Sequence, residues 1–238
     1  PGTGRGAVSG NGLLTEGKFG IHCIEAGGPE PGVGCAGYGI TRMLEALSRD
    51  KLLDPGRFDV AVFDILGDVV CGGFAAPLRQ GFAEKVFIVV SEELASLYAA
   101  NNIARAVRTY SPNGVVLGGL IANLRDPAVD REAMERFTGL LNTRILDYFL
   151  RVVRVREAEY RRKTLLEHAP DSDIVRGLRV LASDILAVKP GTELLPTPLA
   201  ERLFMESSLR EFRSSPPVRK PRGKDIAEAA PAKPDDSP

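Results

Sequence analysis

The chain has 238 residues, of which 44% are hydrophobic, so it can bury the core of at least one sizeable domain. Its 31 Lys and Arg residues balance its 31 Asp and Glu residues, which leaves no net field to attract nucleic acid or an acidic membrane surface. No run approaches the roughly 18 apolar residues of a membrane span, and the N-terminus lacks the order of a signal peptide; we therefore expect a cytoplasmic protein with no nucleic-acid or membrane partner.

Short apolar runs alternate with segments of helical spacing along most of the chain. The runs, rich in Val, Ile, Leu and Phe, are residues 58–63, 86–90, 115–121 and 144–149. The segments with a helical apolar stripe are residues 40–47, 94–107 and 178–185. Runs that are apolar on both faces suit parallel strands covered by helices. The pattern predicts an α/β fold, a doubly wound and mostly parallel sheet with helices on both faces, whose ligands bind beyond the carboxyl ends of the strands.

The composition changes near residue 189, where prolines and charges begin to dominate. We expect an irregular N-terminal segment at residues 1–18, one α/β domain at residues 19–188, and a Pro-rich, largely disordered C-terminal tail at residues 189–238. Within that tail, residues 194–212 can still form a short helix.

A near match to a phosphate-binding loop lies at residues 12–19 (GLLTEGKF). Phe19 replaces the hydroxyl residue that would hold magnesium, and no apolar strand precedes the segment to place it at a strand-to-helix turn. We therefore expect that Lys18 does not bind phosphate.

Two of the three cysteines lie in Gly-flanked segments. Cys35 lies within GGPEPGVGCAGYG, and Cys71 lies within DILGDVVCGGF, whereas Cys23 lies in an apolar run and is expected to be buried. A [4Fe–4S] cluster needs four thiolates, so two such cysteines from each subunit of a twofold dimer would complete one. The same two cysteines can instead bind a different metal or form a redox pair.

An acidic residue, Asp64, directly follows the expected strand at residues 58–63. The carboxyl end of a strand is where a magnesium-water ligand belongs in a nucleotide-hydrolysing α/β protein. The spacing from Asp64 to Gly67 also resembles a switch element, in which a glycine N–H senses the terminal phosphate.

The segments GGPEPGVGCAG, DILGDVVCGGFAAP, SLYAANNI and LGGLIAN together resemble nitrogenase iron proteins and their relatives in tetrapyrrole reduction and other nitrogenase-like systems. The resemblance covers about residues 19–187 and implies a P-loop NTPase-like fold. It also implies a homodimer whose [4Fe–4S] cluster bridges the two subunits through Cys35 and Cys71 of each. By the same resemblance, Asp64, Gly67 and Asp68 belong to the switch that links the nucleotide state to the cluster.

The resemblance implies MgATP as a second cofactor, with Asn123 and Glu159 as its adenine-side contacts. Both residues have ordinary structural alternatives, because Asn123 can simply end a strand and Glu159 can lie on a solvated helix face. Leu150 and Val152 also stand where the family has Pro and Asp around an arginine, which weakens the nucleotide assignment.

The function implied is that of an oxidoreductase, an ATP-dependent iron–sulfur subunit that donates single electrons to a nitrogenase or nitrogenase-like catalytic heterotetramer and is itself reduced by ferredoxin or flavodoxin. The phosphate-loop part of the family domain is not found in the sequence, so we expect an N-terminally truncated fold without ATPase activity. The alternative is a truncated, non-hydrolysing cluster-binding protein or a remnant of such a reductase. Tyr38 replaces the arginine that the family uses for regulatory ADP-ribosylation, so we expect that regulation to be absent.

Overall fold

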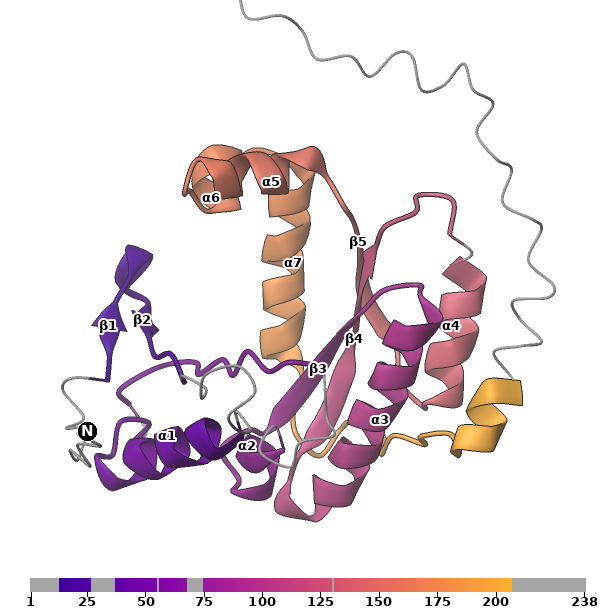
Figure 1. Cartoon of the computed structure of the whole chain (residues 1–238), viewed down its shortest axis with the longest axis horizontal. Helices are drawn as coiled ribbons and strands as arrows, with labels where there is room; N and C mark the ends of the chain where they lie inside the picture. The colour runs from indigo at the N-terminus through magenta and orange to yellow at the C-terminus, as the bar shows by residue number, and fades with distance from the viewer. Residues whose placement is uncertain (1–12, 27–36, 55, 68–74, 130, 207–238) are drawn as a thin grey trace, which may run out of the picture.

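The computed structural model describes residues 13–26, 37–54, 56–67, 75–129 and 131–206. A parallel three-stranded sheet, ordered β3-β4-β5, lies at the centre of the described fold, and an antiparallel pair, β1-β2, lies apart from it (Figure 1). In chain order the elements are β1 (Thr15–Glu16), η2 (Lys18–Gly20), β2 (His22–Cys23), α1 (Gly37–Arg49), α2 (Ala76–Arg79), β3 (Lys85–Val90), α3 (Leu94–Tyr110), η3 (Ser111–Asn113), β4 (Val116–Leu124), α4 (Arg131–Leu140), β5 (Ile145–Leu150), α5 (Val153–Tyr160), α6 (Leu165–His168) and α7 (Asp173–Ala187).

The three-stranded sheet confirms three of the expected strands. Strand β4 is central and pairs in parallel with both neighbours, from Lys85↔Val116 along β3 and from Leu120↔Ile145 along β5. The buried side chains of β4 are at most 2% exposed: Leu117, Leu120, Ala122 and Leu124. A strand enclosed in this way needs an almost continuous apolar sequence, which is the pattern that identified it.

Two adjacent glycines allow the neighbours of β4 to approach closely. A Cβ atom on Gly118 would lie 2.4 Å from Cε1 of Phe87, and one on Gly119 would lie 2.9 Å from Cγ of Leu146. Gly119 also has a φ of 147°, a backbone conformation that side chains disfavour, and the register with β3 shifts at this point. The pair therefore forms an irregularity that only glycine accommodates without displacing both neighbouring strands.

Helices cover both faces of the sheet, as expected for a doubly wound α/β fold. Consecutive residues of β5 show the two sides: the Tyr148 hydroxyl donates a hydrogen bond to Glu135 of α4 at 2.5 Å, while Phe149 faces Gly177 of α7. The larger hydrophobic cluster, which we call the main core, includes Leu117, Leu120 and Leu124 of β4. Helix α3 packs beside α4 against this main core, and α7 lies on the opposite side of the sheet (Figure 1). Among the described helices, none is both long enough and apolar enough to span a membrane.

The expected strand at residues 58–63 is not formed. Phe58 makes a β-bridge, and residues 60–66 have no regular secondary structure. Val60 and Val62 are 56% and 85% exposed, although their sequence is that of a buried strand. A strand exists only through hydrogen bonds to a neighbour, and in the described residues β3 pairs with β4 alone, so this apolar run has no partner.

Residues 189–206, which we call the C-terminal strap, pack onto the domain. Its helical end, residues 201–206, places Phe204 in the main core at 1% exposure, in edge-to-face contact with Tyr98 and Phe137. The fully buried amide of Asn101 donates to the Leu199 carbonyl at 3.0 Å and accepts from the Leu199 N–H at 2.8 Å.

Residues 189–206 are thus ordered, whereas we expected them to belong to a largely disordered tail. A few apolar and backbone groups suffice to fix a proline-rich segment against a formed domain. Of the expected helix at residues 194–212, only residues 201–206 are helical within the described part, and residues 207–238 lie outside it. The domain boundary at residue 188 stays a prediction.

Candidate functional site

The flanks of the two expected metal ligands are described, although Cys35, Cys71 and the expected switch residue Asp68 lie outside the described residues. Helix α1 begins at Gly37, two residues after Cys35, and Ala75 precedes α2, four residues after Cys71. The starts of α1 and α2 are therefore the described parts of the chain that follow the two cysteine segments.

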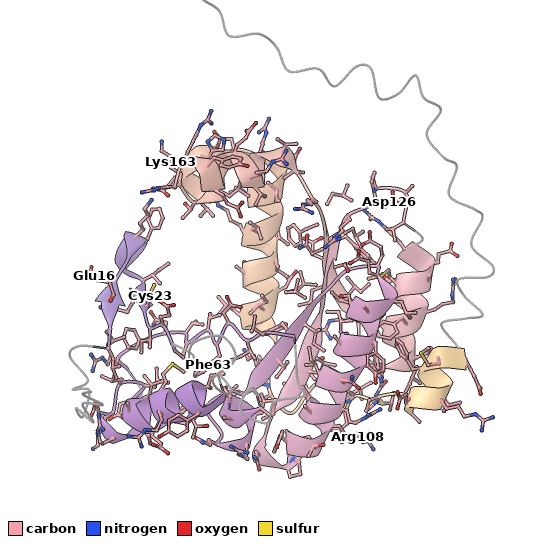
Figure 2. The ribbon with its side chains drawn as sticks, in the orientation of Figure 1. Glu16, Cys23, Phe63, Arg108, Asp126 and Lys163 are labelled. Carbon is pink, nitrogen blue, oxygen red and sulfur yellow. The ribbon has the colours of Figure 1, made fainter. Side chains whose placement is uncertain are left out.

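One hydrophobic cluster, which we call the second core, joins both flanks. Its buried residues are Ile40, Leu44 and Leu47 of α1, Leu52 after it, and Ala76 of α2. Phe63, the residue before Asp64, packs against the same cluster and lies 6.5 Å from Phe82 between ring centroids; Figure 2 shows it next to α1. The helix after Cys35, the residue before Asp64 and the helix after Cys71 thus share a single core.

The donor chemistry of these two segments fits an iron–sulfur cluster. Thiolates are the ligands of such clusters, and two cysteines per chain give half of a four-thiolate set. The amino end of α1 lies next to Cys35 in the sequence, and its partial positive charge favours the thiolate form of a nearby cysteine. In the part of the chain that the structure describes, no group of three or more His, Cys, Asp or Glu residues offers an alternative metal site.

Cys23 is exposed on β2, so the expectation that it is buried was wrong. Strands β1 and β2 have two residues each, all of them exposed, and such a small pair has too little surface to enclose a side chain. Figure 2 shows Cys23 on this hairpin, apart from the three-stranded sheet.

Asp64 and Gly67 are both exposed. They follow Phe63, which packs against the second core. A Cβ atom on Gly67 would meet no heavy atom within 4 Å, so crowding in the described fold does not require glycine at this position. The role expected for Gly67 depends instead on its backbone N–H, and the switch role of Asp64, Gly67 and Asp68 stays a prediction.

The two expected adenine contacts lie toward the carboxyl end of the sheet. Asn123 is the penultimate residue of β4 and is paired in register with Phe149, and Glu159 lies on α5, which begins soon after β5 ends. Both side chains are exposed, and among the described residues no hydrogen bond or ion pair joins them to each other or to Asp64. The fold thus places Asn123 and Glu159 on elements that leave the same end of the sheet but does not itself assemble them into a closed site.

Sequence reasoning missed a carboxylate at this end of the sheet. Glu92 follows β3, and its carboxylate accepts hydrogen bonds from the backbone N–H groups of Arg125, at 3.1 and 3.2 Å, and Asp126, at 3.0 Å. The neighbouring Glu93 accepts from the Arg125 guanidinium at 3.0 Å. The detectable signal was a pair of acidic residues one position after the end of an apolar strand, close to the position argued for Asp64.

The lysine of the near-match phosphate loop has a different role. Lys18 lies in the short turn between β1 and β2, and its ammonium lies 2.8 Å from both carboxylate oxygens of Glu167. Glu167 also completes a capping box with Thr164 at the start of α6. The Lys18 hydrogen bond, followed by those from the backbone and side chain of Thr164, lowers the pKa of Glu167 to about 2. The turn joins the two strands of the small antiparallel pair, and the expectation that Lys18 does not bind phosphate stays a prediction.

Removing the Lys18 ammonium should raise the pKa of Glu167 from about 2 toward its ordinary value of 4.5. Because Thr164 keeps its hydrogen bonds to Glu167, the rise should be partial. Lys18→Met removes the charge at similar side-chain length, and a carbon-detected NMR titration of the glutamate carboxyl groups measures the pKa. The depressed pKa means that the contact stabilises the fold above pH 4.5 and is lost as the pH falls toward 2.

Lys51→Met removes another exposed ammonium and should leave the pKa of Glu167 unchanged. An unaltered pKa in Lys18→Met would mean that the Lys18–Glu167 pair does not form in solution.

Comparison with known proteins adds to this geometry. Residues 5–213 match a family described as 4Fe-4S iron sulfur cluster binding proteins, NifH/frxC family. The chain is similar to the nitrogenase iron protein of Methanococcus voltae, with 41% identity over 191 residues, which is 80% of this chain and 68% of that protein. It is also similar to nitrogenase iron protein 2 of Paenibacillus durus, with 41% identity over 204 residues, 85% of this chain and 68% of that protein.

Proposed function

Because the chain belongs to the NifH/frxC family of 4Fe–4S iron–sulfur cluster binding proteins, we propose that it is an ATP-coupled reductase that donates single electrons to a nitrogenase or nitrogenase-like catalytic complex. The observation that supports this proposal is the second core, which joins the helix after Cys35, the helix after Cys71 and the residue before Asp64 in one unit. An oxidoreductase role follows from the family, while the nucleotide coupling and the partner are part of the proposal.

Cys35 and Cys71 are the residues that would hold the cluster. Two thiolates per chain support a homodimer in which one cluster bridges the two subunits. A bound [4Fe–4S] cluster supplies one-electron transfer, and a position between two subunits keeps it close to the surface, where a partner protein can approach. The protein would supply the thiolates and the helix end that follows Cys35, and the second core joins the helices that follow the two cysteines.

The nucleotide would bind toward the carboxyl end of the sheet, with Asn123 and Glu159 at the adenine. Asp64 would hold the magnesium-bound water, and the Gly67 N–H would sense the terminal phosphate. Gly67 lies four residues before Cys71, so a phosphate-driven shift of this segment, Asp68 included, must be transmitted to a cluster ligand. This short covalent path is the proposed link between the nucleotide state and electron release.

The proposed partners follow from the kind of protein that the relatives are named for. A nitrogenase iron protein serves a nitrogenase, so we place a catalytic heterotetramer downstream and a ferredoxin or flavodoxin upstream, in the cytoplasm. The balanced charge of the chain, 31 basic and 31 acidic residues, supports recognition of proteins through local surfaces more than through a net field.

Nucleotide coupling should be visible at the cluster. In anaerobically reconstituted, reduced protein extended upstream by a phosphate loop, which residues 1–238 do not supply, MgATP is expected to change the electron paramagnetic resonance signal, because Asp64 and Gly67 are joined to Cys71 by a short segment. Asp64→Asn should keep its iron and lose the response, since the amide cannot replace the carboxylate toward magnesium. Asp59→Asn, an exposed acidic residue five positions earlier, is the matched control and should respond as the wild type does.

A protein with a full iron content and no response to MgATP would bind a cluster without nucleotide coupling and would contradict the proposal. An Asp64→Asn variant that responds as the wild type does would remove Asp64 from the switch.

A further inference from the structure

Glu92 occupies the short connection between β3 and α3, and it stabilises a different part of the chain. Its carboxylate accepts three hydrogen bonds from two backbone N–H groups, those of Arg125 at 3.1 and 3.2 Å and of Asp126 at 3.0 Å. These two residues directly follow β4, where the sheet offers their N–H groups no further strand partner. The carboxylate of Glu92 therefore continues the hydrogen bonding of β4 beyond its last residue.

The backbone around Asn123 is held from several sides. The Leu124 carbonyl accepts a hydrogen bond from the Arg151 N–H at 3.0 Å, so the end of β5 fixes the residue after Asn123. The Asp126 carboxylate accepts from the Ala128 N–H at 2.8 Å and closes the turn that follows. The two N–H groups that Glu92 accepts from, those of Arg125 and Asp126, lie between these contacts in the sequence. Glu92 is the acceptor in this arrangement that comes from a distant part of the chain. Figure 2 shows Asp126 in the turn beyond β4.

The neighbouring ion pair contributes less to this arrangement. The Glu93 carboxylate lies 3.0 Å from the Arg125 guanidinium, but the two side chains are 50% and 61% exposed. Exposed ion pairs are screened by water and therefore fix the neighbouring backbone only weakly. A carboxylate that accepts hydrogen bonds from backbone N–H groups fixes the main chain directly. Hydrogen bonds to an ionised acceptor are also stronger than those between neutral groups. Glu92 and Glu93 are thus adjacent acids with different expected effects.

We propose that Glu92 is a positioning residue for adenine recognition, because its carboxylate fixes the turn that orients the side-chain amide of Asn123. This inference rests on the nucleotide site proposed above. A fixed Asn amide can accept from the adenine N6 amino group and donate to the adjacent ring nitrogen N7, whereas guanine presents two acceptors on that edge. The orientation of the amide, more than its presence, therefore decides whether adenine is preferred over guanine.

The test compares the dissociation constants of MgADP and MgGDP, measured by isothermal titration calorimetry on the full chain extended upstream by a phosphate loop, which residues 1–238 do not supply. Glu92→Ala should weaken MgADP binding by about tenfold while changing MgGDP binding by less than about twofold. The variant loses the hydrogen bonds that fix the turn after Asn123, and the oriented Asn123 amide favours adenine only. Glu92→Gln should retain most of the preference, since its amide oxygen can still accept a backbone N–H. Glu93→Ala is the matched control and should bind both nucleotides as the wild type does.

Asn123→Ala separates this inference from the nucleotide site on which it rests. If Asn123→Ala weakens MgADP binding and Glu92→Ala does not, the positioning role is overturned and the nucleotide site stands. Equal losses of MgADP and MgGDP affinity in Glu92→Ala would also overturn it, because a general disturbance of the fold has no base preference. If Asn123→Ala binds MgADP as the wild type does, the adenine assignment itself fails. Thermal unfolding of each variant identifies any that fails to fold, and Glu92→Gln then carries the comparison.

Discussion

Replacing Cys35 or Cys71 by serine is expected to abolish cluster binding. Each chain contributes two thiols to a proposed four-thiolate set, so either substitution removes two of the four ligands from a symmetric dimer. Serine is nearly isosteric with cysteine but is a poor ligand for iron–sulfur clusters. Iron and sulfide analysis after anaerobic reconstitution should fall from about two iron atoms per chain, one cluster per two chains, to background, with loss of the visible charge-transfer absorption.

Cys23→Ser is the matched control, because Cys23 is the exposed free thiol on β2 and no described metal site includes it. This variant should retain the full iron content. Anaerobic sizing gives the second readout, since a bridging cluster requires a dimer. A complete four-iron cluster on a monodisperse monomer would contradict the bridging arrangement, and an unchanged iron content in Cys35→Ser would remove that residue from the ligand set.

Phe204→Ala is expected to lower the free energy of unfolding by about 3 to 5 kcal/mol. The Phe204 side chain is 1% exposed, and its ring lies in edge-to-face contact with Tyr98 of α3, at 5.4 Å between centroids, and Phe137 of α4, at 6.2 Å. Removing this ring leaves a cavity between two helices and the strap and also loses two aromatic contacts. Urea unfolding followed by circular dichroism measures the change.

Leu203→Ala tests the same strap at a neighbouring position where the side chain is 53% exposed, and its effect should stay within about 0.5 kcal/mol. Equal stability of Phe204→Ala and the wild type would mean that residues 189–206 do not form part of the core in solution. The comparison thus decides whether the domain extends beyond residue 188.

Strands β3, β4 and β5 were all predicted from continuous apolar runs. In the central strand β4 the pattern follows from enclosure on both faces, because a strand covered on both sides tolerates few polar residues. The two outer strands have the same apolar pattern but are less buried, since Val89 of β3 is 63% exposed and β5 contains no fully buried residue. The same pattern at residues 58–63 was misleading, since composition reports that a segment can be buried in a sheet but not which strand it pairs with. The strap was missed for the complementary reason: its prolines argue against regular structure, yet Phe204 and the Leu199 backbone need only a preformed surface.

For the candidate site, the sequence by itself determined the residue types and their spacing: two Gly-flanked cysteines, the acidic residues Asp64 and Asp68 between them, and an Asn near the end of β4. It also showed that Lys18 lacks the context of a phosphate loop, but not that its partner is Glu167, 149 positions away. Contacts between distant residues, such as Glu92 with the Arg125 N–H, depend on which strands become neighbours. Local sequence sets what a segment can form, and the pairing of strands and packing of helices decide which of its polar groups meet.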